Sequence, residues 1–313
     1  MSADEKPRIV SLLPSATEIV CALGLENALL GITHECDYPP GLAAKKPALT
    51  ASRIAHDTMT SAEIDHAVRS QLDGHGSIYD LDEEKLRALE PNLILTQELC
   101  DVCAVSYRTV SEAAARLGGD GEIKVVSLEP RTIKEIFANI RTVGELTGRG
   151  EEAEQLVAQL EARLNAVVLA LSEIDYHPRV LMLEWLEPFF APGHWVPEQV
   201  ALAGGDHRFG HLGEASRTTT IEEIAAYDPE IIVLIPCGFY KEDTVRALAS
   251  VNFPAGWNEL PAVKNGAVWA VDATAYFSRP GPRVVDGVDI LARIFHPEVY
   301  GAPSAREAVR IKS

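Results

Sequence analysis

The chain has 313 residues, of which 47% are hydrophobic and 24% charged, so it is long enough to bury a core in each of two domains. Its 46 acidic residues outnumber 28 basic ones and give a formal net charge of −18, which argues against nucleic acid and anionic membranes as partners. No stretch approaches the roughly 18 to 20 apolar residues that a membrane span requires. The opening segment, MSADEKPRIVSLLPS, shows no apolar leader, so we expect a cytoplasmic protein.

Strands and helices are expected to alternate in the first part of the chain. An apolar segment ends at Pro14 and is followed by a stretch with helical spacing that stops at Gly24. Paired prolines in HECDYPP end the next strand, because proline cannot continue a strand ladder. The predicted strands cover residues 8–13, 29–33, 92–96 and 124–130. This alternation is typical of a parallel sheet, with ligands bound beyond the carboxyl ends of its strands.

A long helical run separates this region from a second one of the same kind. Residues 133–171 have helical spacing that is interrupted only near GRG, which predicts a connecting helix. Strands and helices then alternate again from residue 179 onward. We therefore predict an α/β fold of two lobes with parallel sheets, joined by one long helix, with the ligand cleft between the lobes. The predicted boundaries are 1–132, 133–172 and 173–313.

Several motifs, spread over almost the whole chain, together resemble one family. They are SLLPSATE from Ser11, DYPP from Asp37, the helix-to-strand turns ALEPNLIL and YDPEIIVL, and YFSRPGPR from Tyr276. This set resembles the solute-binding proteins of cobalamin and iron-siderophore transporters, which have the class III periplasmic-binding-protein fold. The resemblance implies that a large metal-containing ligand is held between rigid lobes.

The resemblance also implies a partner if the protein is exported. In the family, one glutamate on each lobe pairs with arginines of a membrane permease, and the matching positions here are Glu84 and Glu222. A local explanation exists as well, because the helix dipole favours a carboxylate in the first turn by about 0.3–1 kcal/mol. Permease docking through these residues is therefore expected only for an exported protein.

Four cysteines follow the ends of predicted strands, at the edge where such sheets bind ligands. They are Cys36, Cys100, Cys103 and Cys237. Four thiolates suit zinc or an iron-sulfur cluster, so this set is a candidate metal site. Two other interpretations stay open: a redox pair formed by the C-x-x-C motif, and ordinary buried thiols. Cys21 has helical spacing with apolar neighbours and is expected to pack in the core.

Other candidate ligand contacts also follow predicted strands. Trp185 and Trp195 are able to stack on a flat macrocycle or to cover the core, and Arg279 is able to pair with an acidic ligand group or a local acid such as Asp272. His34 is a possible metal ligand, hydrogen-bonding group or plain surface residue. The full set is His34, Glu35, Glu98, Trp185, His194, Trp195, Tyr240, Tyr276 and Arg279.

No G-x-S-x-G, P-loop, H-E-x-x-H or G-x-G-x-x-G motif stands at a suitable place, which favours a binding protein over an enzyme. The leading hypothesis is an intracellular binding protein that holds a metal-centred ligand. That ligand is an iron-sulfur cluster or zinc bound by the cysteines, or a corrinoid. The alternatives are the substrate-binding component of a cobalamin or siderophore ABC transporter, and an enzyme that uses its cysteines or a cluster on a thiol or sulfur substrate.

Overall fold

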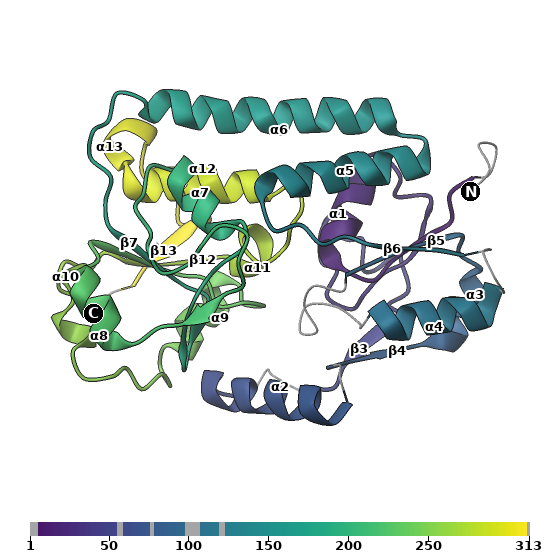
Figure 1. The fold of residues 1–313 in the computed structure, drawn as a ribbon, viewed down its shortest axis with the longest axis horizontal. Helices are drawn as coiled ribbons and strands as arrows, with labels where there is room; N and C mark the ends of the chain where they lie inside the picture. Colours follow the sequence, from purple (N-terminus) through teal and green to yellow (C-terminus); the bar gives the residue numbers. More distant parts are fainter. Residues whose placement is uncertain (1–5, 55–58, 76–77, 98–106, 119–122, 312–313) are drawn as a thin grey trace. The chain divides into compact units, whose positions relative to one another are not determined.

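A computed structural model describes residues 6–54, 59–75, 78–97, 107–118 and 123–311. The chain divides into two compact units (Figure 1). Unit 1 comprises Met1–Met59, Glu63–Pro130 and Glu135–Ala158, and unit 2 comprises Thr60–Ala62, Arg131–Lys134 and Gln159–Ser313. None of the described helices combines the length and the apolar character needed to cross a membrane.

Unit 1 is built on a four-stranded parallel sheet with the order β2-β1-β5-β6. Its strands are β1 (Ile9–Ser11), β2 (Leu29–Gly31), β5 (Leu93–Thr96) and β6 (Lys124–Ser127). The two central strands, β1 and β5, are fully buried, as expected for strands covered on both faces. A separate antiparallel pair joins β3 (Thr50–Ser52) to β4 (Tyr79–Leu81). The helices in this part of the chain are α1 (Pro14–Ala22), α2 (Ser61–His75), α3 (Glu83–Leu89) and α4 (Tyr107–Gly118).

Unit 2 also contains a four-stranded sheet, but one of its edge strands is antiparallel. Its sheet has the order β13-β12-β11-β7, in which only β13 runs antiparallel. The strands are β7 (Val180–Leu183), β11 (Ile231–Leu234), β12 (Val268–Val271) and β13 (Ala308–Arg310). A small second sheet contains β8 (Trp185–Leu186), β9 (Phe189–Ala191) and β10 (Arg217–Thr218). The helices are α7 (Val196–Leu202), α8 (Ile221–Tyr227), α9 (Lys241–Ala247), α10 (Pro261–Lys264), α11 (Ala273–Tyr276), α12 (Val284–Phe295) and α13 (Pro297–Tyr300).

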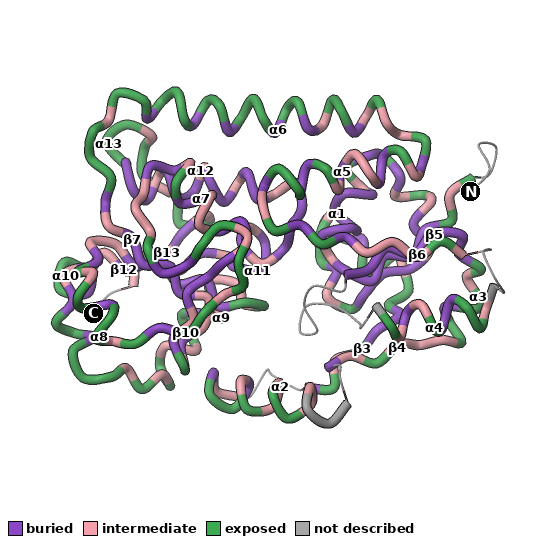
Figure 2. The backbone as a smooth tube through the Cα atoms, viewed as in Figure 1, coloured by how far each residue is buried: buried purple, intermediate pink, exposed green. Residues whose placement is uncertain are grey.

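The predicted connecting helix is two helices, α5 (Ile133–Thr147) and α6 (Gly150–Leu171). The chain breaks at Gly148, whose φ of +70° is a conformation that glycine adopts at little cost. Buried and exposed residues alternate along α6 (Figure 2). The buried ones are spaced by three and four residues, which places them on one face of the helix; they are Ala153, Val157, Leu160, Leu164, Val167 and Leu171.

The α/β fold with parallel sheets is confirmed, and each predicted strand of unit 1 is found, although β1, β2 and β6 end two or three residues before their predicted bounds. The domain boundaries stay predictions, since α5 and the first part of α6 cluster with unit 1. The helix α2 and the strands β3 and β4 were not predicted. Their segments carry neither the long apolar run of a central strand nor a strong helix stop signal.

Candidate functional site

In unit 1, an imidazole and two hydroxyl groups meet just beyond β2. The Thr50 hydroxyl donates to Thr33 Oγ1 at 2.9 Å and accepts the His34 backbone N–H at 3.1 Å. His34 Nδ1 lies 2.7 Å from the same Thr50 oxygen, and the His34 ring lies against Tyr79 with a centroid distance of 5.4 Å. The β3–β4 pair supplies Thr50 and Tyr79, so it holds the imidazole in place.

These contacts orient the His34 ring. The Thr50 hydroxyl gives its single proton to Thr33, so its oxygen is able to accept a proton from His34 Nδ1. The other ring nitrogen, Nε2, lies 3.3 Å from Glu35 Oε1. The side chain of His34 is 27% exposed, so Nε2 can meet a ligand as a hydrogen-bonding or metal-ligating atom.

Cys36 lies in a different environment from its neighbour His34. Its side chain is buried, with 2% exposure, and its sulfur lies 3.1 Å from Thr17 Oγ1 on α1. Thr17 in turn donates to Ser11 Oγ at 2.8 Å, at the end of β1. This hydrogen-bonded row ties β1, α1 and the loop after β2 together inside unit 1.

In unit 2, aromatic residues follow the ends of β7 and β11. Trp185 comes two residues after β7, and its ring meets Phe239 edge-on at a centroid distance of 5.7 Å. The indole Nε1 of Trp185 donates to the Ser61 carbonyl at 3.2 Å. The ring is half-buried, and its polar atom is already satisfied. What Trp185 offers a ligand is therefore an apolar face.

The segment before α7 is held in a strained conformation. His194 has a φ of +52°, which is uncommon outside glycine and often marks functional loops. Its backbone N–H donates to Glu214 O at 2.7 Å and its carbonyl accepts from Gly213 N at 3.0 Å. A side chain at Gly193 would collide with Glu214 O, so only glycine fits this close approach. Burial lowers the pKa of His194, and nearby Arg131 lowers it further.

Buried hydrogen bonds tie the segment after β12 to α7. Gln199, fully buried on α7, donates from Nε2 to Tyr276 O at 3.0 Å and Val284 O at 2.8 Å. Trp195 is 7% exposed and donates from Nε1 to Phe277 O at 3.0 Å. Trp195 therefore belongs to the core of unit 2, whereas Tyr276 stays half-buried at its surface.

Two charged groups complete the surface at the strand ends of unit 2. Glu184 follows β7 directly; burial raises the pKa of its carboxyl group, and a hydrogen bond from Ser216 opposes that rise. Lys241 at the start of α9 pairs with Asp272 after β12, with 3.5 Å between Nζ and Oδ2. Thr274 N also donates to Phe239 O at 3.2 Å, so the segments after β11 and β12 are joined directly.

The structure thus brings many of the predicted residues together within each unit. His34 and Glu35 are neighbours in unit 1, while Trp185, His194, Trp195, Tyr240 and Tyr276 all follow strands of unit 2 or begin helices beside them. Arg279 is buried, with 7% exposure. Supporting residues that sequence reasoning missed include Thr33, Thr50 and Phe239, because single hydroxyl or apolar residues in short loops carry no distinguishing pattern.

The four predicted thiol ligands gain no support as a metal site. Cys36 is buried in unit 1 and Cys237 is exposed in unit 2, while Glu98, Cys100 and Cys103 lie outside the described residues. Within the part of the chain that the structure describes, no three His, Cys, Asp or Glu side chains are placed to hold a metal ion. Cys21 is half-buried, and burial raises the pKa of its thiol to about 11. Zinc and iron-sulfur binding therefore stay predictions.

Two α/β units with polar and aromatic groups beyond their strand ends define a protein of the solute-binding class. The chain belongs to the periplasmic binding protein family, whose model matches residues 9–275. It is 26% identical over 293 residues to the vitamin B12-binding protein of Vibrio cholerae, covering 90% of this chain and 86% of that protein. It is 25% identical over 297 residues to YvrC of Bacillus subtilis, an uncharacterized ABC transporter substrate-binding lipoprotein, covering 95% and 82% of the two chains.

Solved structures agree on the fold. The apo form of the periplasmic heme-binding protein RhuT from Roseiflexus sp. RS-1 superimposes with a TM-score of 0.69 at 22% identity, covering 94% of this chain and all of that one. These comparisons favour the transporter alternative over the intracellular metal-centre hypothesis. The expected cytoplasmic location stays a prediction.

Proposed function

We propose that this chain is the substrate-binding component of an ABC transporter whose cargo is a corrinoid or a related metal-containing tetrapyrrole. One observation carries the proposal: the family match and the relatives named for vitamin B12 or ABC-transporter substrate binding extend over nearly the whole chain, not over one domain. A ligand of this kind offers a broad flat ring and a metal atom. The two units offer groups suited to each.

Trp185 is the candidate contact for the flat ring. Its indole N–H donates to the Ser61 carbonyl, so a ligand would meet the apolar face of the ring. Phe239 packs edge-on against that ring. Aromatic side chains stack on such surfaces with little loss of side-chain freedom. Tyr240 and Tyr276 are half-buried near the same strand ends and extend this candidate surface.

His34 is the candidate contact for the metal or for a polar group beside it. A metal-binding histidine commonly donates its second ring N–H to a fixed acceptor, which sets the ring orientation. Thr50 is able to provide that acceptor at 2.7 Å from Nδ1, which leaves Nε2 as the ring atom for the ligand. A metal-centred ring with an open axial position is therefore a suitable ligand for this side of unit 1.

Glu84 and Glu222 are the candidate contacts for the permease. Each is the second residue of a seven-residue helix, Glu84 in α3 and Glu222 in α8, and both are exposed. Neither carboxylate has a hydrogen bond or ion pair with another described residue. Two carboxylates on separate units suit basic groups on a partner protein.

Equilibrium titration of the purified chain with aquocobalamin and with hemin tests the cargo class. We expect saturable binding of at least one of them near one ligand per chain, with a change in the absorption spectrum of the metal complex. His34→Ala should remove or shift that spectral change. Arg69→Gln, which removes an exposed ion pair with Asp65 on α2, should leave it unchanged. A chain that binds neither probe contradicts the proposal.

A further inference from the structure

The same arginine contact occurs once in each unit. Arg8 Nε donates to Glu90 O at 2.6 Å in unit 1, and Arg179 Nε donates to Asp228 O at 2.8 Å in unit 2. Each arginine directly precedes the first strand of its unit's main sheet, β1 or β7. Each accepting carbonyl belongs to the residue that ends a seven-residue helix, α3 or α8.

The backbone of each arginine is held in a matching way. Arg8 N donates to Asn92 Oδ1 at 2.8 Å, and Arg179 N donates to Glu230 Oε2 at 2.9 Å. Asn92 and Glu230 lie two residues after the helix ends and directly before β5 and β11. In both units the arginine therefore joins the start of one strand to the turn that leads into the next. We call each set an arginine clamp.

Each clamp acts on a turn that is costly to hold. Glu90 and Asp228 have φ values of 45° and 58°, in the left-handed region that costs non-glycine residues about 1–2 kcal/mol. The helix before each turn has only two turns and is marginal on its own. The arginine donates to a carbonyl at the helix end and places positive charge at the negative pole of the dipole.

The opposite end of each helix is fixed as well. Asp82 accepts from Lys85 N at 2.9 Å in α3, and Thr220 forms a reciprocal capping box with Glu223 in α8. One further carboxylate per helix contacts its own unit: Glu83 pairs with Arg116 at 2.7 Å, and Glu223 accepts from Thr219 Oγ1 at 2.7 Å. In both helices the second residue is thus the exposed acid whose carboxylate has no contact with another described residue.

We propose that Arg8 and Arg179 are a matched pair of positioning residues that hold α3 and α8 so that Glu84 and Glu222 face basic groups of the permease. This inference rests on the proposed function. Both ends of each short helix are fixed to its own unit, and in each helix the exposed carboxylate at the second position has no contact with another described residue. The clamps limit the orientations of those carboxylates before the partner binds, which reduces the ordering cost of docking.

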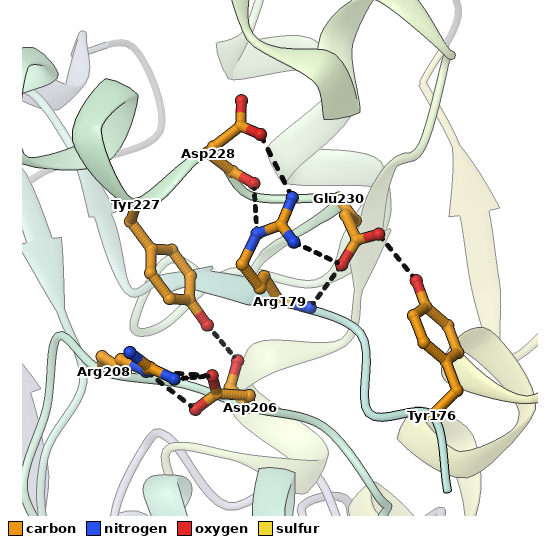
Figure 3. A network of polar contacts seen from close by, with 7 residues as sticks. All are labelled: Tyr176, Arg179, Asp206, Arg208, Tyr227, Asp228 and Glu230. Carbon is orange, nitrogen blue, oxygen red and sulfur yellow. Dashed lines mark hydrogen bonds and ion pairs between the residues drawn. The ribbon is translucent and has the colours of Figure 1, made fainter.

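The clamp of unit 2, drawn in Figure 3, includes more polar contacts than the clamp of unit 1. Arg179 also contacts the Asp228 carboxylate at 3.1 Å and Glu230 at 3.4 Å, and Glu230 accepts from Tyr176 at 2.8 Å. Unit 1 has the neutral Asn92 where unit 2 has Glu230. Bonds between charged groups are stronger than neutral ones, so loss of Arg179 should have the larger effect.

The first measurement is hydrogen exchange on the whole chain. Arg179→Gln should speed exchange of the backbone amides of residues 224–231 about tenfold, which corresponds to about 1.4 kcal/mol. Amides of unit 1 should be unchanged. Arg246→Gln, which removes an exposed arginine from α9 with the same change of charge, serves as the control and should leave residues 224–231 unchanged.

The second measurement is binding of each variant to the cognate ABC permease in nanodiscs. We expect Glu222→Gln and Arg179→Gln each to weaken association, and the double variant to be no weaker than Glu222→Gln alone. That non-additivity separates positioning from general destabilisation. Equal weakening by Arg179→Gln in both backgrounds, or no weakening by it at all, overturns the clamp inference while docking through Glu222 stands. Unchanged association of Glu84→Gln and Glu222→Gln overturns docking itself, and the inference falls with it.

Discussion

The two units present different chemistry beyond their strands. Unit 1 exposes an imidazole ring that Thr50 orients, so a ligand would meet one directed ring nitrogen. Unit 2 exposes aromatic rings, and the N–H of Trp185 is already used inside the unit. The difference shows how one fold, used twice, can divide recognition into a directional contact and a non-directional one. The predictions below change one side of this comparison at a time.

The largest effect is expected from Gln199→Leu in unit 2. The change removes the Nε2 donor to Tyr276 O and Val284 O inside the core. Tyr276 O is then unsatisfied, which costs about 1–3 kcal/mol, whereas Val284 O still accepts within α12 and loses one hydrogen bond worth about 0.5–1.5 kcal/mol. We expect the free energy of unfolding to fall by about 2–4 kcal/mol in a denaturant titration. Gln155→Leu on the exposed face of α6 should be nearly neutral. Stability within about 0.5 kcal/mol of wild type for Gln199→Leu would show that these bonds do not support the surface.

The second prediction concerns the loss of stability of unit 2 at acidic pH. Burial lowers the pKa of His207 to about 4. Its Nδ1 lies 3.1 Å from Val180 O, and its ring packs against the ring of Phe209. Because the folded pKa is lower than the unfolded one of about 6.5, the unfolded chain binds the proton first as pH falls. Stability from this group is full above about pH 6.5 and is lost between there and pH 4.

The size of that loss is about 3 kcal/mol for the full interval. It should appear as a steeper fall in the unfolding free energy between pH 6.5 and 4 for wild type than for His207→Gln. Equal slopes for the two proteins would show that His207 titrates normally in the folded chain.

The sequence predicted the parts of this molecule that rest on periodicity. Apolar strands such as Leu93–Thr96 and the glycine stop near Gly148 have local sequence signals. The alternation of strands and helices and the break between α5 and α6 could therefore be predicted from the sequence. Glu84 and Glu222 were identified as candidate permease contacts only through the resemblance to the solute-binding family. Tertiary partners had no such signal: Thr50 lies sixteen residues after His34, and the two arginine clamps join residues about fifty to eighty positions apart. Contacts of that range are set by the fold.

On the unit 1 side, Thr50→Val should weaken binding of whichever probe, aquocobalamin or hemin, the wild-type chain takes. The valine keeps the size but removes the hydroxyl that contacts His34 Nδ1, so the ring loses its fixed orientation. We expect about tenfold weaker binding, which corresponds to about 1.4 kcal/mol. Ser52→Ala on the same strand should have little effect, since Ser52 bonds only within its own turn. Wild-type affinity in Thr50→Val together with lowered affinity in His34→Ala would contradict the claim that Thr50 orients His34 for ligand binding.

The smallest effect is expected for Cys36→Ser. The serine hydroxyl can keep the contact with Thr17 in the same buried place, so ligand affinity and metal content should stay close to wild type. Elemental analysis after anaerobic purification measures the metal. A metal present in the wild type and lost in Cys36→Ser would instead support a thiolate site.

The comparison of the two surfaces depends most directly on Trp185. Calorimetric titration with the probe that binds should give affinity about tenfold weaker for Trp185→Leu than for wild type, because loss of ring stacking costs up to about 1.5 kcal/mol. The matched change Trp269→Leu, on β12 and beside Arg310, should leave the affinity unchanged. Wild-type affinity in Trp185→Leu would contradict the account that unit 2 receives the flat face of a tetrapyrrole.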